Sequence, residues 1–189
     1  MIERTLLLFE KPGPENTEAT LRAAAERAEV LGIEQVVLAS TTGDTAIRAA
    51  EILDASKRKI IAVTLAAGLW EKYEPPDPEK IARARAAGVH VLTATHSLMG
   101  NIESAIRDKF GSLPPGELLA HAYYRLSQGF KVAVEVVLMA ADAGLLNMER
   151  EVIGIGGTNS GADTAVVMTP AYSVSFFSCN ICEIIAMPR

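Results

Sequence analysis

Two spacings of apolar residues alternate along the first half of the chain. Short apolar runs predict buried strands at residues 5–9, 35–39, 59–64 and 89–93. Between these runs, apolar residues recur at every third or fourth position, which predicts helices at residues 17–31, 45–55 and 78–87. We expect Asn16 or Thr17 to cap the first helix. Strands that alternate with helices favour a parallel sheet with right-handed crossovers and helices on both faces.

The second half of the chain begins with helices and returns to strands. Helices are predicted at residues 100–110, 117–126 and 129–144, and strands at residues 151–155, 165–168 and 181–186. The third of these helices is apolar nearly all round, so it should be buried on most sides, with Glu135 paired to Lys131 one turn earlier. Residues 174–177 also form a strand-like stretch. We predict one α/β domain over residues 1–189, a three-layer sandwich with a mostly parallel sheet.

Composition narrows the class of protein. The 189 residues fit one domain, and 49% hydrophobic with 22% charged residues is typical of a folded globular chain rather than a disordered one. The formal net charge of −5 disfavours binding to a nucleic-acid backbone. The start of the chain lacks the pattern of a secretory signal, and charges interrupt the long apolar stretches, so we expect a soluble cytoplasmic protein that does not enter membranes. Alanine-rich helix faces would also permit close packing in a homo-oligomer.

The segment at residues 40–45, with the sequence STTGDT, joins the second predicted strand to the second predicted helix. Hydroxyl and backbone N–H groups at such a turn can converge on one tetrahedral anion, and Gly43 lets the backbone turn closely around it. The pattern resembles the phosphate loop of flavodoxins, which holds the phosphate of flavin mononucleotide with hydroxyls and amides and without Lys or Arg. The alternative is a Ser/Thr-rich helix cap in which Thr42 or Asp44 caps the helix by itself.

A second candidate is the glycine-rich segment at residues 154–164. Its four glycines let the backbone approach a flat or bulky ligand closely, and its polar side chains offer hydrogen bonds. A strand-like run follows, so this is not a dinucleotide-binding turn that opens a helix. The alternative is a loose turn between neighbouring strands, but the segment is long for a tight hairpin, and we favour a binding loop.

The remaining candidates are weaker. His96 follows the fourth predicted strand, where it could contact a ligand or transfer a proton, although a helix-capping or solvated histidine fits as well. Trp70 and Tyr73 could cover a planar ring or could simply pack. Cys179 and Cys182 form a CxxC pattern without the other ligands of a zinc site or the helix of a redox motif, so we expect two structural cysteines. No catalytic triad, Walker lysine or carboxylate cluster stands out, and no metal site is expected.

The whole chain resembles the stand-alone prokaryotic proteins that are similar to the C-terminal α/β domain of pyruvate kinase. The matching segments lie at residues 11–17, 40–46, 60–64, 132–135, 139–145, 156–158 and 161–165. Pyruvate kinase transfers its phosphoryl group in a (β/α)8 barrel that is absent from this sequence, so the resemblance does not imply kinase activity.

The resemblance also has implications for the ligand. In the full enzyme the C-terminal domain can bind a phosphorylated sugar through a Ser/Thr/Gly loop like residues 40–45, usually with basic residues close by. The segment here carries Asp44 and no Lys or Arg, which disfavours a bisphosphate and suits a phosphate monoester. The stand-alone family implies a flavin mononucleotide site at the sheet edge, which agrees with the flavodoxin-like loop.

We therefore expect this protein to bind flavin mononucleotide, which would carry any redox chemistry. The phosphate would lie on residues 40–45, and the ribityl chain and ring would lie along the glycine-rich segment, near Asn16 or His96. The expected cofactor-binding residues are Asn16, Thr17, Ser40, Thr41, Thr42, Gly43, Asp44, Thr45, Thr64, His96, Gly156, Gly157, Thr158, Ser160, Gly161, Ala162 and Asp163. The alternative is a regulatory module that binds a phosphosugar or a nucleotide without chemistry.

Overall fold

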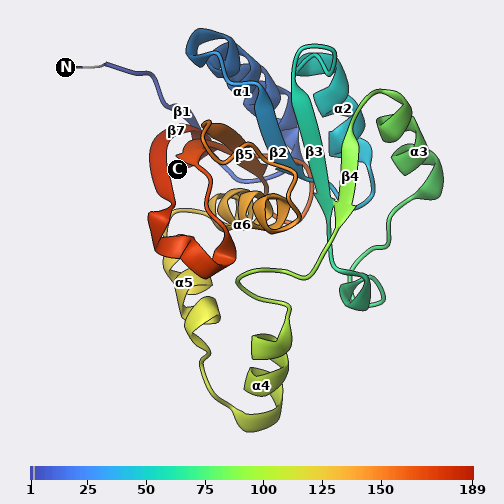
Figure 1. The fold of residues 1–189 in the computed structure, drawn as a ribbon, viewed down its shortest axis with the longest axis vertical. Helices are drawn as coiled ribbons and strands as arrows, with labels where there is room; N and C mark the ends of the chain where they lie inside the picture. Colours follow the sequence, from blue (N-terminus) through green and yellow to red (C-terminus); the bar gives the residue numbers. More distant parts are fainter. Residues whose placement is uncertain (2) are drawn as a thin grey trace.

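A computed structural model describes Met1 and residues 3–189, in which helices cover both faces of a seven-stranded sheet (Figure 1). The strands are β1 (Leu7–Phe9), β2 (Gln35–Ala39), β3 (Lys59–Thr64), β4 (His90–Thr93), β5 (Val152–Gly156), β6 (Thr164–Thr169) and β7 (Asn180–Pro188). The α-helices are α1 (Thr17–Leu31), α2 (Asp44–Ile52), α3 (Pro78–Ala86), α4 (Ile102–Phe110), α5 (Pro115–Tyr123) and α6 (Gln128–Asp142). Short 3-10 helices are η1 (Pro14–Asn16), η2 (Ala67–Leu69) and η3 (Ser173–Ser178).

The strand order in the sheet is β1-β7-β6-β5-β2-β3-β4. β6 runs antiparallel to both of its neighbours, β5 and β7, and every other pair of neighbouring strands in this sheet is parallel. The mostly parallel three-layer α/β fold predicted from the sequence is therefore confirmed.

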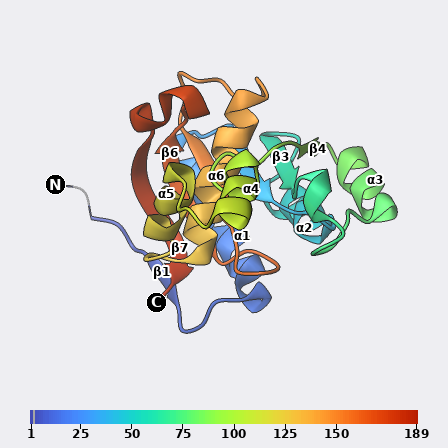
Figure 2. The ribbon, with the colours of Figure 1, turned by 90° about the horizontal axis from the view of Figure 1, so that it is seen from below.

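One strand supplies side chains to two separate cores. Val36 and Leu38 of β2 pack with Ala24 of α1 and Ala46 of α2, and α1, α2 and α3 lie side by side on this face (Figures 1 and 2). Val37 points to the other face, where it packs with α6. Successive side chains of a strand point to opposite faces, so both layers are anchored on the same strand.

α6 lies directly on β5 and is buried, as its apolar sequence predicted. A Cβ atom on Gly154 would lie 2.6 Å from the carbonyl oxygen of Ala133, and one on Gly156 would collide with the carbonyl oxygen of Gly129. Glycine at these two strand positions therefore sets the distance between helix and sheet. None of the helices in the described part of the chain is long and apolar enough to cross a membrane.

The first strand is less buried than its sequence predicted. Residues 5–9 were expected to form a buried strand, but β1 covers only Leu7–Phe9, and Leu7 and Leu8 are 37% and 50% exposed. The reason is position, because β1 lies at the edge of the sheet and pairs with β7 alone. The strand-like stretch at residues 174–177 is also wrong, since it lies in η3.

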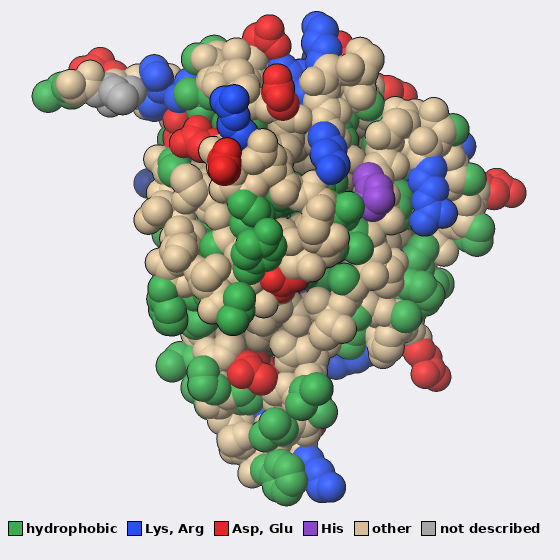
Figure 3. All heavy atoms as spheres, in the orientation of Figure 1, with side chains coloured by type: hydrophobic (Ala, Val, Ile, Leu, Met, Phe, Trp, Pro, Cys, Tyr) green, Lys and Arg blue, Asp and Glu red, His purple; other side chains and the backbone are tan. Residues whose placement is uncertain are grey.

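α4 projects from the body of the protein beside α5 (Figures 1 and 2). None of its residues is buried, and Ile102, Ile106 and Phe110 are exposed. Hydrophobic side chains accordingly gather over the projecting end of the molecule in Figure 3. The helix is held instead by the buried carboxylate of Glu117, which accepts hydrogen bonds from Arg107 and Ser104.

Candidate functional site

The carboxyl ends of β5, β2, β3 and β4 lie next to one another, because these four strands are parallel neighbours. The direction of winding reverses between β5 and β2. The chain passes from β2 to β3 through α2 on one face, whereas α6 on the other face leads into β5. Ligands of open α/β sheets bind at such a reversal point. The predicted site residues that follow these four strands therefore reach the same edge.

The start of α2 has open N–H groups. Its N-cap is Gly43, with φ of 104°, which has no side chain that could cap the helix. The alternative of a cap formed by Thr42 or Asp44 is therefore wrong. The Ser40 hydroxyl accepts the N–H of Ala46, the third residue of the helix, at 3.1 Å. Within the described residues, the amides of Asp44 and Thr45 meet no protein acceptor, so they are available to an anion.

Thr45 adds a hydroxyl to this helix start. The residue is 7% exposed, and its hydroxyl forms no hydrogen bond with another described residue. Because the Cα–Cβ bond of a helical residue tilts toward the helix N-terminus, the side chain of Thr45 leans toward the start of α2.

Lys80 of α3 brings a cation to the same place. Its ammonium lies 2.7 Å from the carboxylate of Asp44, which also accepts the hydroxyl of Thr42 at 3.1 Å. The hydrogen bond with Lys80 lowers the pKa of Asp44, and the same bond raises the pKa of Lys80. The sequence motif missed Lys80 because it lies on another helix. Its signal was indirect: α3 follows β3, so its first turn had to lie at the carboxyl edge.

The glycine-rich loop is held by the buried carboxylate of Asp163. This carboxylate accepts the N–H groups of Gly13 and Thr158 at 3.2 and 3.1 Å, and the Thr164 hydroxyl at 2.8 Å. Because β5 and β6 are antiparallel neighbours, residues 157–163 connect them as a long hairpin loop. The alternative of a turn between neighbouring strands is therefore confirmed as far as the connection is concerned. The binding role of the loop stays a prediction.

The loop after β1 packs against this hairpin loop. The Thr17 hydroxyl accepts the N–H of Ala162 at 3.0 Å and donates to the carbonyl of Pro14 at 2.6 Å. Asn16 donates its side-chain amide to the carbonyl of Lys11, so neither predicted residue caps α1 with its side chain.

Glycines and tight turns keep this pair of loops compact. A Cβ on Gly161 would collide with the Thr17 hydroxyl, and one on Gly157 would collide with the carbonyl of Gly161. The N–H of Ser160 bonds to the carbonyl of Thr158 at 2.8 Å, which folds the tip of the hairpin loop back on itself. These predicted residues thus form one ordered backbone surface.

The third and fourth strands are tied together at the same edge. The hydroxyls of Thr64 and Thr93 lie 2.7 Å apart, and the Thr41 hydroxyl accepts the N–H of Leu65 at 3.0 Å. The Trp70 indole donates to the carbonyl of Leu65 at 2.8 Å, which fixes its ring against the loop after β3. Of the predicted site residues, Thr41 and Thr64 therefore position the edge through bonds within the protein.

His96 also joins parts of the protein to one another. Its Nε2 atom accepts the N–H of Ala66 at 3.2 Å, and its Nδ1 atom lies 3.4 Å from the carboxylate of Glu135 on α6. Both ring nitrogens thus have protein partners. His96 connects the loop after β3 with α6, and its contact with a flavin stays a prediction.

Glu135 is a buried anion with several partners. It accepts the N–H groups of Leu98 and Met99 at 2.8 and 3.2 Å and pairs with Lys131, as predicted from the helix spacing. Burial alone raises the pKa of Glu135, but the hydrogen bond from His96 and the charge of Lys131 outweigh it and lower this pKa to about 2.

Neither the two cysteines nor the possible metal ligands form a reactive or metal-binding site. Cys179 and Cys182 are free thiols, and burial raises the pKa of Cys179 to about 11, so this thiol is protonated at neutral pH. Among Met1 and residues 3–189, no group of three or more His, Cys, Asp or Glu side chains is arranged to hold a metal ion.

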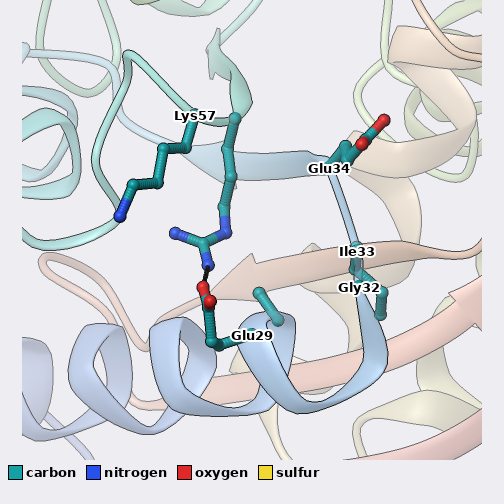
Figure 4. Close-up of a pocket in the computed structure, with 7 residues that line it drawn as sticks. Glu29, Gly32, Ile33, Glu34 and Lys57 are labelled. Atoms are coloured by element: carbon teal, nitrogen blue, oxygen red, sulfur yellow. Dashed lines mark hydrogen bonds and ion pairs between the residues drawn. The ribbon is translucent and has the colours of Figure 1, made fainter.

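A shallow cavity of about 140 Å³ lies at the opposite, amino edge of the sheet (Figure 4). Arg58 crosses it, with its guanidinium 2.7 Å from the carboxylate of Glu29. None of the predicted site residues lines this cavity, whose lining is Ala28, Glu29, Gly32, Ile33, Glu34, Lys57 and Arg58. A second, open hollow lies over residues 74–79, in the loop that leads into α3.

Comparison with known proteins gives no match to a protein-family model. Among solved structures, the chain is similar to a pyruvate kinase from Cryptosporidium parvum over 82% of its length, with 15% identity and a TM-score of 0.43. Two further structures of this organism's pyruvate kinase, one in complex with ADP, match 85% of the chain with 15% and 14% identity and TM-scores of 0.42 and 0.40. The chain spans 23 to 24% of the length of these pyruvate kinases. The fold itself is established by the strand order and pairing described above.

Proposed function

We propose that this protein binds flavin mononucleotide at the carboxyl edge of its sheet, with the phosphate at the N-terminus of α2. The observation that carries the proposal is the unsatisfied start of this helix. The Ser40 hydroxyl satisfies the amide of Ala46, but the amides of Asp44 and Thr45 have no partner among the described residues. Open amides, a hydroxyl and a nearby ammonium are the donors that a phosphate monoester requires.

The hairpin loop after β5 supports the remainder of the flavin. Leu38 of β2 pairs with Ile155 of β5, so the chain leaves the two strands at neighbouring points of the edge. The carboxylate of Asp163 and the hydroxyl of Thr17 hold the backbone of this loop in place before any ligand binds. A bound flavin would supply electron or hydride transfer, and the residues of the chain would bind and orient it.

The deciding experiment compares flavin mononucleotide with riboflavin, which lacks only the phosphate. We expect purified protein, as isolated or after addition of the nucleotide, to show flavin absorption bands and a raised melting temperature. Riboflavin should bind at least about tenfold more weakly, because it cannot bond to the start of α2. Colourless protein that flavin mononucleotide does not stabilise would contradict the proposal, and stabilisation by a phosphosugar or nucleotide alone would support the regulatory alternative.

A matched pair of variants locates the phosphate. Thr45→Val removes the hydroxyl but keeps the shape of the side chain of this buried residue, and it should weaken flavin mononucleotide binding about tenfold while riboflavin binding stays unchanged. Thr169→Val removes a hydroxyl at the amino edge of the sheet, where β6 ends and where this hydroxyl accepts the N–H of Asn180, and it should change neither affinity. Equal losses in both variants, or for both ligands, would place the phosphate elsewhere.

A further inference from the structure

We propose that β1 is the interface at which two copies of this chain form a two-fold dimer, with their sheets joined edge to edge. The observation that carries the inference is the sequence of residues 3–11, ERTLLLFEK, whose charged and apolar residues complement the same segment running in the opposite direction. The inference does not depend on which ligand the protein binds.

The outer edge of β1 is free to pair. β1 is the outermost strand of the sheet and pairs with β7 alone, so half of its backbone N–H and C=O groups point away from the sheet (Figure 1). Natural edge strands are commonly protected against pairing by a charged residue or a proline. Residues 5–9, with the sequence TLLLF, contain neither. This edge therefore lacks the usual protection against another strand.

The leucines of this segment are exposed on both faces of the sheet. Leu7 points to one face, whereas Leu6 and Leu8 point to the other, and the three residues are 37%, 40% and 50% exposed. A strand that is apolar on both faces is typical of the interior of a sheet. A second copy beside β1 would make it an inner strand and would extend it from Leu7–Phe9 to residues 5–9, the strand that the sequence predicts.

The charges at the two ends of the segment select an antiparallel second copy in one register. When two β1 strands run antiparallel about a two-fold axis through Leu7, residues equally distant from Leu7 lie opposite each other. Arg4 then faces Glu10 of the partner copy, and Glu3 faces its Lys11. A shift by one residue would instead place Arg4 opposite Lys11, or Glu3 opposite Glu10. Because like charges directly opposite each other are unfavourable, only the register centred on Leu7 satisfies both ends.

The same arrangement limits the assembly to two copies. Pairing about a two-fold axis uses the β1 edge of both molecules, so no free β1 edge is left for a third copy. The outermost strand at each end of the joined sheet would then be β4, which ends the opposite side of the sheet in one copy. The geometry therefore predicts a closed dimer and not a fibre.

Reversal of the charges at the two ends of the segment tests the inference, with sedimentation of the full chain from about 1 µM to about 1 mM as the measurement. We expect the wild type to form a dimer whose fraction rises over this range. Arg4→Glu and Glu10→Arg, each alone, place like charges opposite each other at two points and should weaken the dimer about tenfold. Both residues are exposed, so the fold should tolerate either change.

Combining the two changes restores the opposite charges. The double variant Arg4→Glu/Glu10→Arg should dimerise as the wild type does, and an equal mixture of the two single variants should form mixed dimers more strongly than either variant alone. Arg125→Glu, at an exposed position between α5 and α6, makes the same change in net charge and is the matched control. It should dimerise as the wild type does.

Three outcomes overturn the inference. The first is a wild type that stays monomeric up to about 1 mM. The second is a dimer that neither single reversal weakens, or that the double variant does not restore, because the copies then meet elsewhere or in another register. The third is an Arg125→Glu variant that loses as much affinity as Arg4→Glu, which would show a general effect of net charge.

Discussion

Helices α6 and α4 show two ways in which a helix with an apolar pattern is held in one protein. α6 buries 12 of its 15 residues, whereas α4 buries none of its 9. α6 is positioned by packing on the sheet, through the glycines of β5, and α4 by polar bonds to Glu117 on the next helix. The difference teaches that an apolar pattern predicts a helix with an apolar face. The surrounding elements decide whether that face is buried.

Each helix is also bonded to a buried carboxylate, and the two carboxylates connect different parts of the fold. Glu135 on α6 joins the helix to His96 and the loop after β4. Glu117 joins α5 to α4 and to nothing in the sheet. We therefore expect changes at α6 to alter global stability and changes at α4 to act locally.

The largest effect is expected where α6 meets β5. Gly156→Ala would place a methyl group against the carbonyl oxygen of Gly129, so the helix must move away from the sheet. We expect a loss of about 3 kcal/mol in the free energy of unfolding, measured with urea. The matched control is Gly68→Ala, where a Cβ would meet no atom within 4 Å, and it should change stability by less than about 0.5 kcal/mol. Equal stabilities of the two variants would contradict the tight packing of α6.

The second effect is a pH dependence that Glu135 confers. Its pKa is lowered from 4.5 to about 2 in the folded protein, so its ionised form stabilises the fold above pH 4.5. That contribution is lost as the pH falls from 4.5 to 2, and it amounts to about 3 kcal/mol over this range. Unfolding of Glu135→Gln over the same range is the control, because the amide does not titrate. The idea fails if both proteins lose stability with the same slope.

A smaller and local effect is expected at Glu117. Glu117→Gln removes the charge that holds Arg107, so α4 should open more often, at a free energy lower by about 1.5 kcal/mol. Amide hydrogen exchange in α4 should become about tenfold faster, while exchange in α6 stays the same. Asp108→Asn is the control, because this exposed residue pairs with the same arginine and should contribute little. Faster exchange in α6 as well would show that the two helices are coupled.

The smallest effect is expected on the outer face of α4. Phe110→Ser replaces a side chain of a residue that is 70% exposed, so the free energy of unfolding should change by less than about 0.5 kcal/mol. Thermal melts at several protein concentrations measure this. If the variant is less stable than the wild type by more than about 1 kcal/mol, and this difference grows with protein concentration, another molecule covers this face.

The parts of the fold that sequence predicted best are those with local signals. A helix was predicted at residues 78–87, and the structure shows α3 at Pro78–Ala86, with Pro in its first turn and Asp77 accepting the N–H groups of Glu79 and Lys80. β1 was misjudged because a run of leucines has the same pattern in a central strand as at an edge. The strand that decides its burial, β7, lies at the other end of the chain.

The candidate site was predicted only where its residues are contiguous. Residues 40–45 were recognised as a unit, but the cation beside them was not, because Lys80 reaches the site through the packing of α3 against Gly43. The structural role of His96 was also invisible, and so was the bond from Gly13 to Asp163, since these partners lie far away along the chain. Long-range geometry of this kind is set by the packing of helices on the sheet and leaves no local pattern.

The pairing of β1 with β7 also affects how the chain folds. Leu7 pairs with Ala186, and the N–H of Arg189 bonds to the carbonyl of Phe9 at 2.9 Å. Almost the entire chain separates these partners, so the loop-closure entropy of this pair is among the largest in the protein. Contacts of such high contact order form late and slow the folding of a domain. The loop after β1, which completes the candidate site through Gly13 and Thr17, can then reach its final position only once β7 has joined the sheet.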